Sequence, residues 1–335
     1  PKDCTIIGQK LKPMLNATLI YNPLAGPANL SAPITLVADY WRTYGWRVAI
    51  KPTQFAGHAT ILAQEAVTAG HQLVLAGGGD GTLCEVANGL VGTETVLGLL
   101  PLGTGNSLAK ELGIPLPQRW NTHRLLQAAE VLAAGRVQRI DLGLRTDRAG
   151  GNGRYWVLWA GVGADGFLSH QMEPRPKWSK KLGVTGYALQ GLAVAPQAPV
   201  FAAAVEVDGR TYEGNFVLIV VSNCRRYAGG ELLLSPQAQM DDGLFEVWLF
   251  RGEHIARAFL YLPEIMLGRH LDDGDLTVIN GRTITIHTDR PIPAQTDGDR
   301  AGHSPLTVSI QPRALRLLVP NTAPADLFSQ PGEEI

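Results

Sequence analysis

The stretch with the clearest chemical potential in this sequence is a run of glycines that ends in a carboxylate. Residues 77–82 read Gly-Gly-Gly-Asp-Gly-Thr, between an apolar run at 72–76 and a segment with helical spacing. Glycines let backbone N–H groups approach a ligand, and the start of a helix favours an anion. The stretch therefore predicts a phosphate-binding turn in which Asp80 holds Mg²⁺ through water or positions an attacking hydroxyl. A tight structural turn with Asp80 as a helix cap is the alternative.

Two further glycine-rich loops carry polar groups. One covers 21–27 and contains Asn22, and the other covers 99–115 and contains Thr104, Asn106 and Ser107. The carboxyl ends of parallel strands meet at one edge of a sheet, so the three loops would form one polar floor. This favours a single phosphate site over three unrelated turns. The sequence has neither a P-loop pattern nor a G-x-G-x-x-G fingerprint in the required context.

The elements that must position these loops alternate in type. The hydrophobic patterns predict strands, and a helix follows each of the glycine-rich stretches or intervening turns. Such an alternation indicates an α/β domain with a parallel sheet covered on both faces. We expect strands at 17–22, 46–50, 72–76 and 96–100, and helices at 31–44, 58–70, 106–113 and 123–135, with one more directly after the glycines.

The second half has a different pattern. Strand-like runs dominate after residue 143, with helices near 178–194 and 254–268 and a hairpin at 206–214. We therefore expect an α/β domain at 1–143 and a mainly antiparallel β-sandwich domain at 144–320. The last segment of the second domain could pack back on the first, and the tail at 321–335 should be ordered only in part.

Composition excludes several classes of protein. The 335 residues are 45% hydrophobic and 18% charged, with a formal net charge of -1, so no strong field attracts nucleic acid. No apolar run approaches the roughly 18 residues that a membrane span requires. The three cysteines form neither a metal-type pair nor a disulfide framework. These features predict a cytoplasmic protein that meets a membrane only from the water side.

The three loops resemble the nucleotide-binding motifs of the diacylglycerol kinase catalytic family, which includes sphingosine, ceramide and bacterial lipid kinases. The matching segments are NPLAG, GGGDGTLCEVANGL and PLGTGNSLAKELGIP, and the likeness extends to 180–187, 235–247 and 296–300. It covers roughly residues 16–320. The resemblance implies that 1–143 is an ATP-binding domain and 144–320 a lipid-substrate domain, with the active site in the cleft between them. It also implies ATP-dependent phosphorylation of a lipid hydroxyl.

The resemblance also assigns ligand residues by position. A magnesium site would use the Asp242 carboxylate and the backbone carbonyls of Gln239 and Leu244, and oxygen ligands suit such a cation. A plain Asp-Gly turn is the alternative there. The ATP site would be lined by Asn22, Thr53, Gly78, Gly79, Asp80, Gly81, Thr82 and Thr104.

The general base departs from the family pattern. In the family the general base is the glutamate of an Asp-Gly-Glu motif, whereas this chain reads Asp297-Gly298-Asp299. Asp299 would accept the hydroxyl proton, and Asp80 would act electrostatically or position the metal. Asp299 is one methylene shorter than Glu, and a misplacement of about 1 Å can cost ~100-fold in rate. Either the loop sits closer here or activity is reduced, and Asp297 is the next candidate for the proton acceptor.

The charges that should meet phosphate or membrane are also unusual. The basic residues that often follow the first motif in the family are missing here, so Arg225, Arg226 and the segment 175–181 are candidates. A solvated charged face is the alternative. In that segment Trp178 lies among lysines, which predicts peripheral contact with an anionic membrane surface. The three lysines are Lys177, Lys180 and Lys181.

Together these observations predict an ATP- and Mg²⁺-dependent lipid kinase. One alternative is NAD kinase, which shares the Gly-Gly-Asp-Gly-Thr motif and a related fold and whose second motif residues 160–168 resemble a little. The other is a catalytically weak regulator that binds lipid or nucleotide. The sequence leaves the lipid open among diacylglycerol, sphingoid base, ceramide, phosphatidylglycerol and polyprenol. It also leaves the oligomeric state open, a homodimer included.

Overall fold

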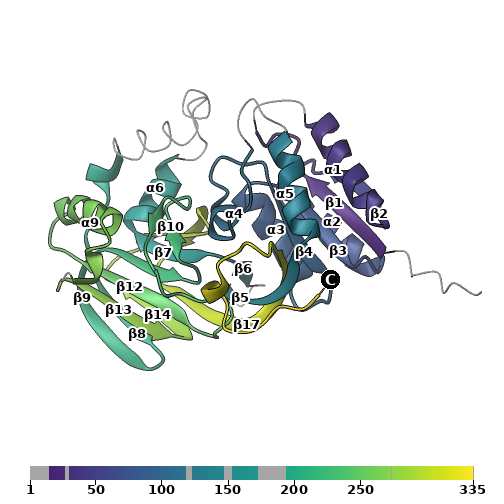
Figure 1. The fold of residues 1–335 in the computed structure, drawn as a ribbon. Coiled ribbons are helices and arrows are strands. Elements are labelled where there is room, and N and C mark those ends of the chain that lie inside the picture. Colours follow the sequence, from purple (N-terminus) through teal and green to yellow (C-terminus); the bar gives the residue numbers. More distant parts are fainter. Residues whose placement is uncertain are drawn as a thin grey trace, which may run out of the picture.

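The computed structural model describes residues 15–26, 30–117, 123–146, 153–172, 194–272 and 274–334. An α/β region and a mainly antiparallel region share one continuous sheet (Figure 1). In the α/β region the parallel strands lie in the order β4-β3-β1-β2. Their bounds are β1 (Leu15–Tyr21), β2 (Trp46–Pro52), β3 (Leu73–Gly78) and β4 (Val96–Pro101). The helices are α1 (Ser31–Thr43), α2 (His58–Thr68), α3 (Asp80–Leu90), α4 (Ser107–Glu111) and α5 (His123–Ala133).

Helices cover both faces of the parallel sheet. Helix α1 packs beside α5, and α2 packs beside α3. Every residue of β3 and β4 is buried, as expected for strands covered on both sides. The predicted strands and helices of this half are confirmed, with ends that differ by about two residues at most.

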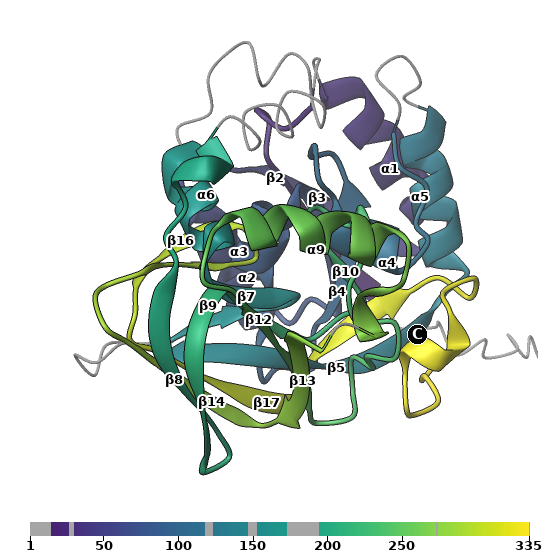
Figure 2. The ribbon, with the colours of Figure 1, turned by 90° about the vertical axis from the view of Figure 1, so that its left-hand side faces the viewer.

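The second region is mainly antiparallel, as predicted. Its hairpin pairs Val207 with Arg210 across Asp208 and Gly209, whose positive φ angles suit the turn. Figure 2 shows α9 (Ala256–Met266) lying across this region. The helix predicted near 178–194 falls mostly outside the described residues. The strands are β7 (Trp159–Gly163), β8 (Phe201–Val207), β9 (Arg210–Ser222), β10 (Arg226–Tyr227), β11 (Leu232–Leu233), β12 (Phe245–Arg251), β13 (Leu276–Gly281), β14 (Thr283–Thr288), β15 (Pro293–Thr296) and β16 (Asp299–His303). The remaining helices are α6 (Ala164–Met172), η1 (Ala195–Gln197), η2 (His270–Asp272) and η3 (Ala325–Leu327).

One long strand joins the two regions. Strand β17 (Leu306–Val319) pairs with β14 at its start and lies parallel to β4 near its end, where Leu317 faces Leu97. It pairs along most of its length with β5 (Arg136–Thr146), which itself carries β6 (Arg154–Trp156). The continuous ladder fixes the position of the antiparallel region relative to the α/β region. The predicted division at residue 143 falls inside β5.

The tail packs against the fold along its whole described length. Val137 and Glu333 exchange two backbone hydrogen bonds of 2.8 Å, and Leu327 is fully buried. The Asp241 carboxylate accepts hydrogen bonds from the backbone N–H groups of Ser329 and Gln330. The expectation of partial order was therefore wrong for 321–334, because long-range contacts outweigh the proline-rich composition.

Within the described ranges, no helix is both long enough and apolar enough to cross a bilayer.

We predict that Leu327→Ala lowers the free energy of unfolding by about 2–4 kcal/mol, because it leaves a cavity in a fully buried site. Urea denaturation measures the change. Leu36→Ala is the matched control, since Leu36 on α1 is 58% exposed and its loss should change the free energy by less than about 0.5 kcal/mol. Equal effects of the two substitutions would contradict the docking of the tail.

Candidate active site

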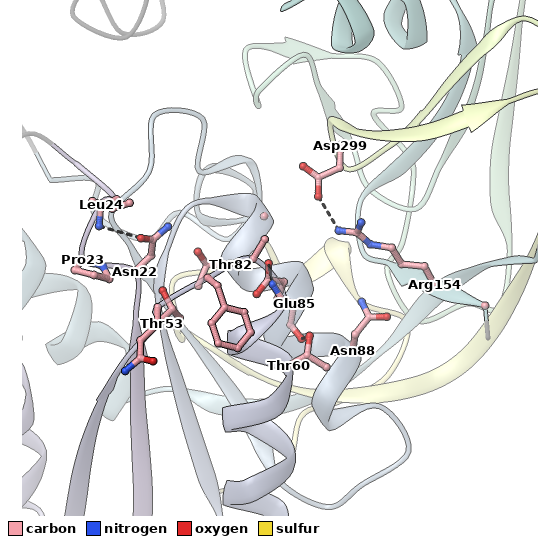
Figure 3. Close-up of a pocket in the computed structure, with 16 residues that line it drawn as sticks. Asn22, Pro23, Leu24, Thr53, Thr60, Thr82, Glu85, Asn88, Arg154 and Asp299 are labelled. Atoms are coloured by element: carbon pink, nitrogen blue, oxygen red, sulfur yellow. Dashed lines mark hydrogen bonds and ion pairs between the residues drawn. The ribbon is translucent and has the colours of Figure 1, made fainter. Parts of the chain in front are cut away.

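A cavity of about 900 Å³ lies where the ends of the parallel strands face the second region. Side chains from both regions point into it (Figure 3). It is lined by Asn22, Pro23, Leu24, Thr53, Gln54, Phe55, Ala56, Gly57, Thr60, Gly81, Thr82, Glu85, Asn88, Gly153, Arg154 and Asp299. Of the predicted ATP-site residues, Asn22, Thr53, Gly81 and Thr82 are among them.

The three glycine-rich loops meet at one edge of the sheet, as predicted. The backbone N–H of Asn22 donates to Gly77 O at 2.9 Å, and that of Leu102 donates to Gly78 O at 2.8 Å. The first loop thus contacts the second, and the second contacts the third. The loop after β2 joins them, because the N–H of Thr53 donates to Tyr21 O at 2.8 Å.

The glycines at 78–81 differ in what surrounds them, and Gly103 of the third loop packs against Gly79. A Cβ atom built on Gly103 would lie 2.4 Å from the Cα atom of Gly79, and one on Gly78 would lie 2.4 Å from Thr82 Cβ. Gly78 and Gly79 therefore permit close packing behind the cavity wall and do not line the cavity. Gly81 differs, because the nearest atom to its built Cβ is Asp299 Oδ1 at 3.9 Å. Of these positions, only Gly81 leaves its side-chain space to a ligand.

Asp80 is engaged within the protein. Its carboxylate accepts hydrogen bonds from the backbone N–H of Ser107 at 2.8 Å and from the Ser107 hydroxyl at 3.2 Å. Burial raises the pKa of Asp80, against the effect of these hydrogen bonds. The carboxylate thus holds the start of α4 and does not line the cavity. Thr104, exposed on the third loop, is not a lining residue either.

One face of α3 lines the cavity and ties other elements to it. Gly81, Glu85 and Asn88 follow the i, i+4, i+7 spacing of a helix face. The Glu85 carboxylate accepts hydrogen bonds from the N–H groups at the start of α2. The Asn88 amide exchanges two hydrogen bonds, of 3.0 and 2.9 Å, with the backbone of Tyr155 on β6. Helical spacing from Gly81 could have revealed both residues, which our sequence reasoning missed.

An aromatic pair stands beside Thr53. The rings of Phe55 and His58 are stacked, with centroids 4.6 Å apart and planes 13° apart. Phe55 lines the cavity although its side chain is 58% exposed. A planar apolar face at the edge of a polar cavity suits an aromatic ligand group.

Asp299 faces α3 from the opposite side and pairs with an arginine. Its Oδ2 atom lies 2.7 Å from Nη2 of Arg154, and the two side chains are 36% and 37% exposed (Figure 3). Asp299 begins β16, directly after a tight turn at Asp297 and Gly298, which both have positive φ angles. The hairpin therefore determines where the carboxylate lies. Nothing in the local sequence around Arg154 indicated its position.

Asp297 is an anchor for this turn. Its carboxylate accepts hydrogen bonds from the backbone N–H groups of Val157 at 2.7 Å, Leu158 at 2.8 Å and Trp159 at 3.2 Å. Burial raises the pKa of Asp297 to about 6, although the three N–H groups favour its charged form. With both oxygens engaged away from the cavity, Asp297 is not placed to accept a proton from a bound hydroxyl.

The predicted magnesium ligands lie outside the cavity. Asp242 is exposed, and its Oδ1 atom accepts a hydrogen bond from the N–H of Leu244 at 3.0 Å. The amide of Gln239 points to Asp326 O at 3.4 Å. No group of three His, Cys, Asp or Glu side chains that could hold a metal occurs in the described ranges. One carboxylate and two carbonyls fit a cation that keeps most of its water, as Mg²⁺ does, and this site stays a prediction.

The two proposed phosphate-binding cations that the structure describes, Arg225 and Arg226, do not line the cavity. Arg225 pairs with Asp326 at 3.1 Å, and Arg226 donates to Gly230 O at 3.1 Å. The segment with Trp178 and its lysines lies outside the described residues. Among the described lining residues, Arg154 is the only lysine or arginine.

Known proteins resemble this chain over most of its length. Residues 16–144 match the model described as "Diacylglycerol kinase catalytic domain", and 163–319 match "YegS C-terminal NAD kinase beta sandwich-like domain". The Bacillus subtilis (strain 168) "Diacylglycerol kinase" is 28% identical over 294 residues, 87% of this chain and 92% of that protein. A Pseudomonas putida KT2440 protein, "Probable lipid kinase YegS-like", is 32% identical over 300 residues, covering 87% and 91%.

Solved structures share the fold. One of them, described as "Crystal structure of a putative diacylglycerol kinase from Bacillus anthracis str. Sterne", has a TM-score of 0.76 at 23% identity. The superposition covers 95% of this chain and 99% of that one. At this identity the likeness establishes the arrangement of the two regions and nothing finer.

We predict that Gly81→Ala leaves the fold intact but weakens ATP binding, because the added methyl group projects into the cavity toward Asp299. Gly103→Ala is the contrasting variant: its methyl group meets the backbone of Gly79, and overpacking should cost about 1–3 kcal/mol of unfolding free energy. Urea denaturation and calorimetric titration with ATP separate the two effects. A destabilised Gly81→Ala protein would show that this glycine serves packing as well.

We further predict that Asp297→Asn lowers the free energy of unfolding by about 1–3 kcal/mol, because its NH₂ group must face buried N–H donors. The raised pKa gives a pH signature. Because the pKa of Asp297 is higher in the folded state, protonation of this group favours folding. The contribution is fully present below about pH 4, where the carboxyl group is protonated in both states, and it is lost as pH rises through about 6. Parent and variant should therefore differ more at pH 4 than at pH 7 in urea denaturation. A stable Asp297→Asn protein would argue against an anchoring role.

Proposed function

Because this chain belongs to the bacterial diacylglycerol kinase and YegS-like lipid kinase family, we propose that it transfers the γ-phosphoryl group of ATP to a lipid hydroxyl. One observation carries the proposal: Asp299 Oδ1 faces Gly81, at the start of α3, across the cavity. A helix start favours phosphate, and a carboxylate opposite it can receive a proton.

The cavity lining suggests how ATP is oriented. Asn22, Thr53 and the exposed face of Phe55 surround one part of it and suit the adenosine moiety. The first N–H groups of α3 lack helical partners, and at Gly81 and Thr82 they are available to phosphate oxygens. The γ-phosphate would then lie on the side of the cavity where Asp299 stands.

The proposed reaction follows from this orientation. As the lipid oxygen forms its bond to the γ-phosphorus, its proton passes to Asp299. The bond between that phosphorus and the bridging oxygen breaks, and the electron pair stays on the ADP formed. Mg²⁺ bound to ATP would neutralise the developing charge. The chain's own part is to place the two reactants and accept the proton.

Asp80 acts in this proposal mainly through Ser107. Its two hydrogen bonds hold the start of α4 beside the glycine turn, so it positions the floor of the cavity. A direct electrostatic contribution to transfer stays a prediction, as does a role for Thr104 toward ATP.

The lipid itself is proposed from the relatives' names. Diacylglycerol is the first substrate to test, because the Bacillus subtilis relative is named for it. Sphingoid bases and the other lipids considered above are the comparison set. Such substrates reside in membranes, which supports peripheral contact with an anionic surface. That contact and a homodimer both remain proposals.

A direct test compares the parent with Asp299 variants, using labelled ATP, diacylglycerol and Mg²⁺. We expect lipid phosphorylation by the parent and a loss of about 10²–10⁴-fold in kcat for Asp299→Asn, since an amide cannot accept the proton. Asp299→Glu distinguishes the two explanations for an aspartate at this position. A faster variant indicates that Asp299 lies too far from the lipid hydroxyl, and a slower one indicates that the loop has moved closer to suit the shorter side chain.

Two outcomes would contradict the proposal. Phosphorylation of NAD but of no lipid would favour the NAD kinase alternative. NAD is included as a control substrate because the family that matches the second domain is described as NAD kinase beta sandwich-like. An Asp299→Asn enzyme with the parent's kcat would show that the proton acceptor lies elsewhere.

A further inference from the structure

We propose that Arg154 binds the terminal phosphate of the nucleotide, and that its ion pair with Asp299 holds the guanidinium in place until the nucleotide arrives. The inference rests on the proposed function and deepens it. It assigns the phosphate-binding cation that the sequence did not reveal, and it couples nucleotide binding to the freeing of the proton acceptor.

The first observation is the charge of the cavity. Its described lining includes two carboxylates, Glu85 and Asp299, and one cation, Arg154. The Glu85 carboxylate is engaged by two N–H groups at the start of α2. A triphosphate entering this cavity needs positive charge beyond that of its magnesium ion. Arginine supplies it well, because its planar fork of donors matches phosphate oxygens.

The second observation is the mounting of Arg154. The adjoining residue, Tyr155, exchanges two backbone hydrogen bonds with the Asn88 side chain of α3. Strand β6 also pairs with β5, where Arg154 lies opposite Arg145. Arg154 is thus attached to the helix whose first turn faces the phosphates. A cation held in this way sits on a rigid element rather than on a free surface loop.

The third observation is the pair itself. Nη2 of Arg154 contacts Oδ2 of Asp299 at 2.7 Å, and both side chains are more than one-third exposed. A guanidinium has five N–H donors, so it can contact a phosphate with other donors or exchange the carboxylate for it. A pair this exposed contributes little to folding. It is therefore suited to rearrangement when a ligand with greater negative charge enters.

The consequence for the reaction is geometric. While the ion pair is intact, Oδ2 of Asp299 is occupied and only Oδ1 faces the start of α3. When Arg154 turns to the γ-phosphate, the whole carboxylate becomes available to the lipid hydroxyl. The arginine would then also lie beside the oxygens that gain charge as the bond to the bridging oxygen breaks.

The experiment measures binding without turnover. Calorimetric titrations with Mg²⁺-ATP and with AMP, both without lipid, are compared for the parent and Arg154→Met. We expect the variant to bind ATP about 10- to 100-fold more weakly, the loss of a hydrogen-bonded charge contact, while AMP affinity stays within about twofold. The ATP affinity of Arg154→Lys should lie between those of the parent and Arg154→Met. Equal ATP affinity in the parent and Arg154→Met would overturn the inference, and so would an equal loss for AMP.

Two control variants show whether the effect is specific to Arg154. Arg139→Met removes an arginine of similar exposure that pairs with Glu94 outside the cavity, and it should leave ATP affinity unchanged. A weakened Arg139→Met protein would point to a general charge effect and overturn the assignment. Asp299→Asn frees Arg154 without removing it, so ATP should bind at least as tightly as to the parent. Weaker binding would contradict the exchange of partners.

Failure of this inference differs from failure of the proposed function. A parent that binds ATP and shows the contrast with AMP, but phosphorylates no lipid, refutes only the lipid kinase assignment. A parent that phosphorylates lipid, with ATP affinity unaltered in Arg154→Met, refutes only the role of Arg154. A parent that binds no ATP refutes both.

Discussion

The geometry of the cavity depends on one buried carboxylate, that of Asp297. It binds three consecutive backbone N–H groups, at residues 157–159, between the strand that carries Arg154 and the strand that follows. The turn that presents Asp299 is fixed to the same point, since Asp297 and Gly298 form it. Asn88 then fixes the neighbouring residue of β6 to α3. The side chains of Asp297 and Asn88 thus connect α3 to the proposed proton acceptor through backbone hydrogen bonds. Backbone contacts of this kind hold positions more firmly than pairs of long side chains do, because less rotamer freedom must be lost.

The glycine-rich floor shows a second constraint, which is close approach of loops. Gly79 and Gly103 touch backbone to backbone, so the second and third loops form one layer rather than two separate cradles. Asp80 closes this layer by binding Ser107. Gly79 and Asp80, which the sequence predicts as ATP-site residues, therefore hold the loops of the site together. The residues that face the ligand space lie one step further along, at Gly81 and on the following turns of α3.

The two departures from the family pattern, the missing basic residues and the shorter acid, both involve Arg154. The family's basic residues after the first motif are missing, and the cavity instead has Arg154 on the opposite wall. The family's Glu is replaced by the shorter Asp299, and that carboxylate lies in contact with the same arginine. The proposed phosphate-binding cation and the proposed base thus both come from the second region, and the α/β region supplies the helix start and the glycine-rich loops. In the proposed mechanism, phosphoryl transfer therefore takes place where the two regions meet.

The resemblance to the family indicated Asp299 as a site residue, and the structure places it beside the cavity. The sequence alone determined the strand and helix order of the α/β half, the meeting of its three loops and the hairpin at Asp208-Gly209. These follow from hydrophobic period, turn chemistry and motif position, all of which act over a few residues. Only the tertiary structure decided what Gly79, Asp80 and Asp297 touch, that Arg154 faces Asp299, and that the tail is part of the core. The physical reason is distance along the chain. Arg154 and Asp299 are 145 residues apart and Gly79 and Gly103 belong to different loops, so their contacts arise from strand pairing and packing that no local pattern records.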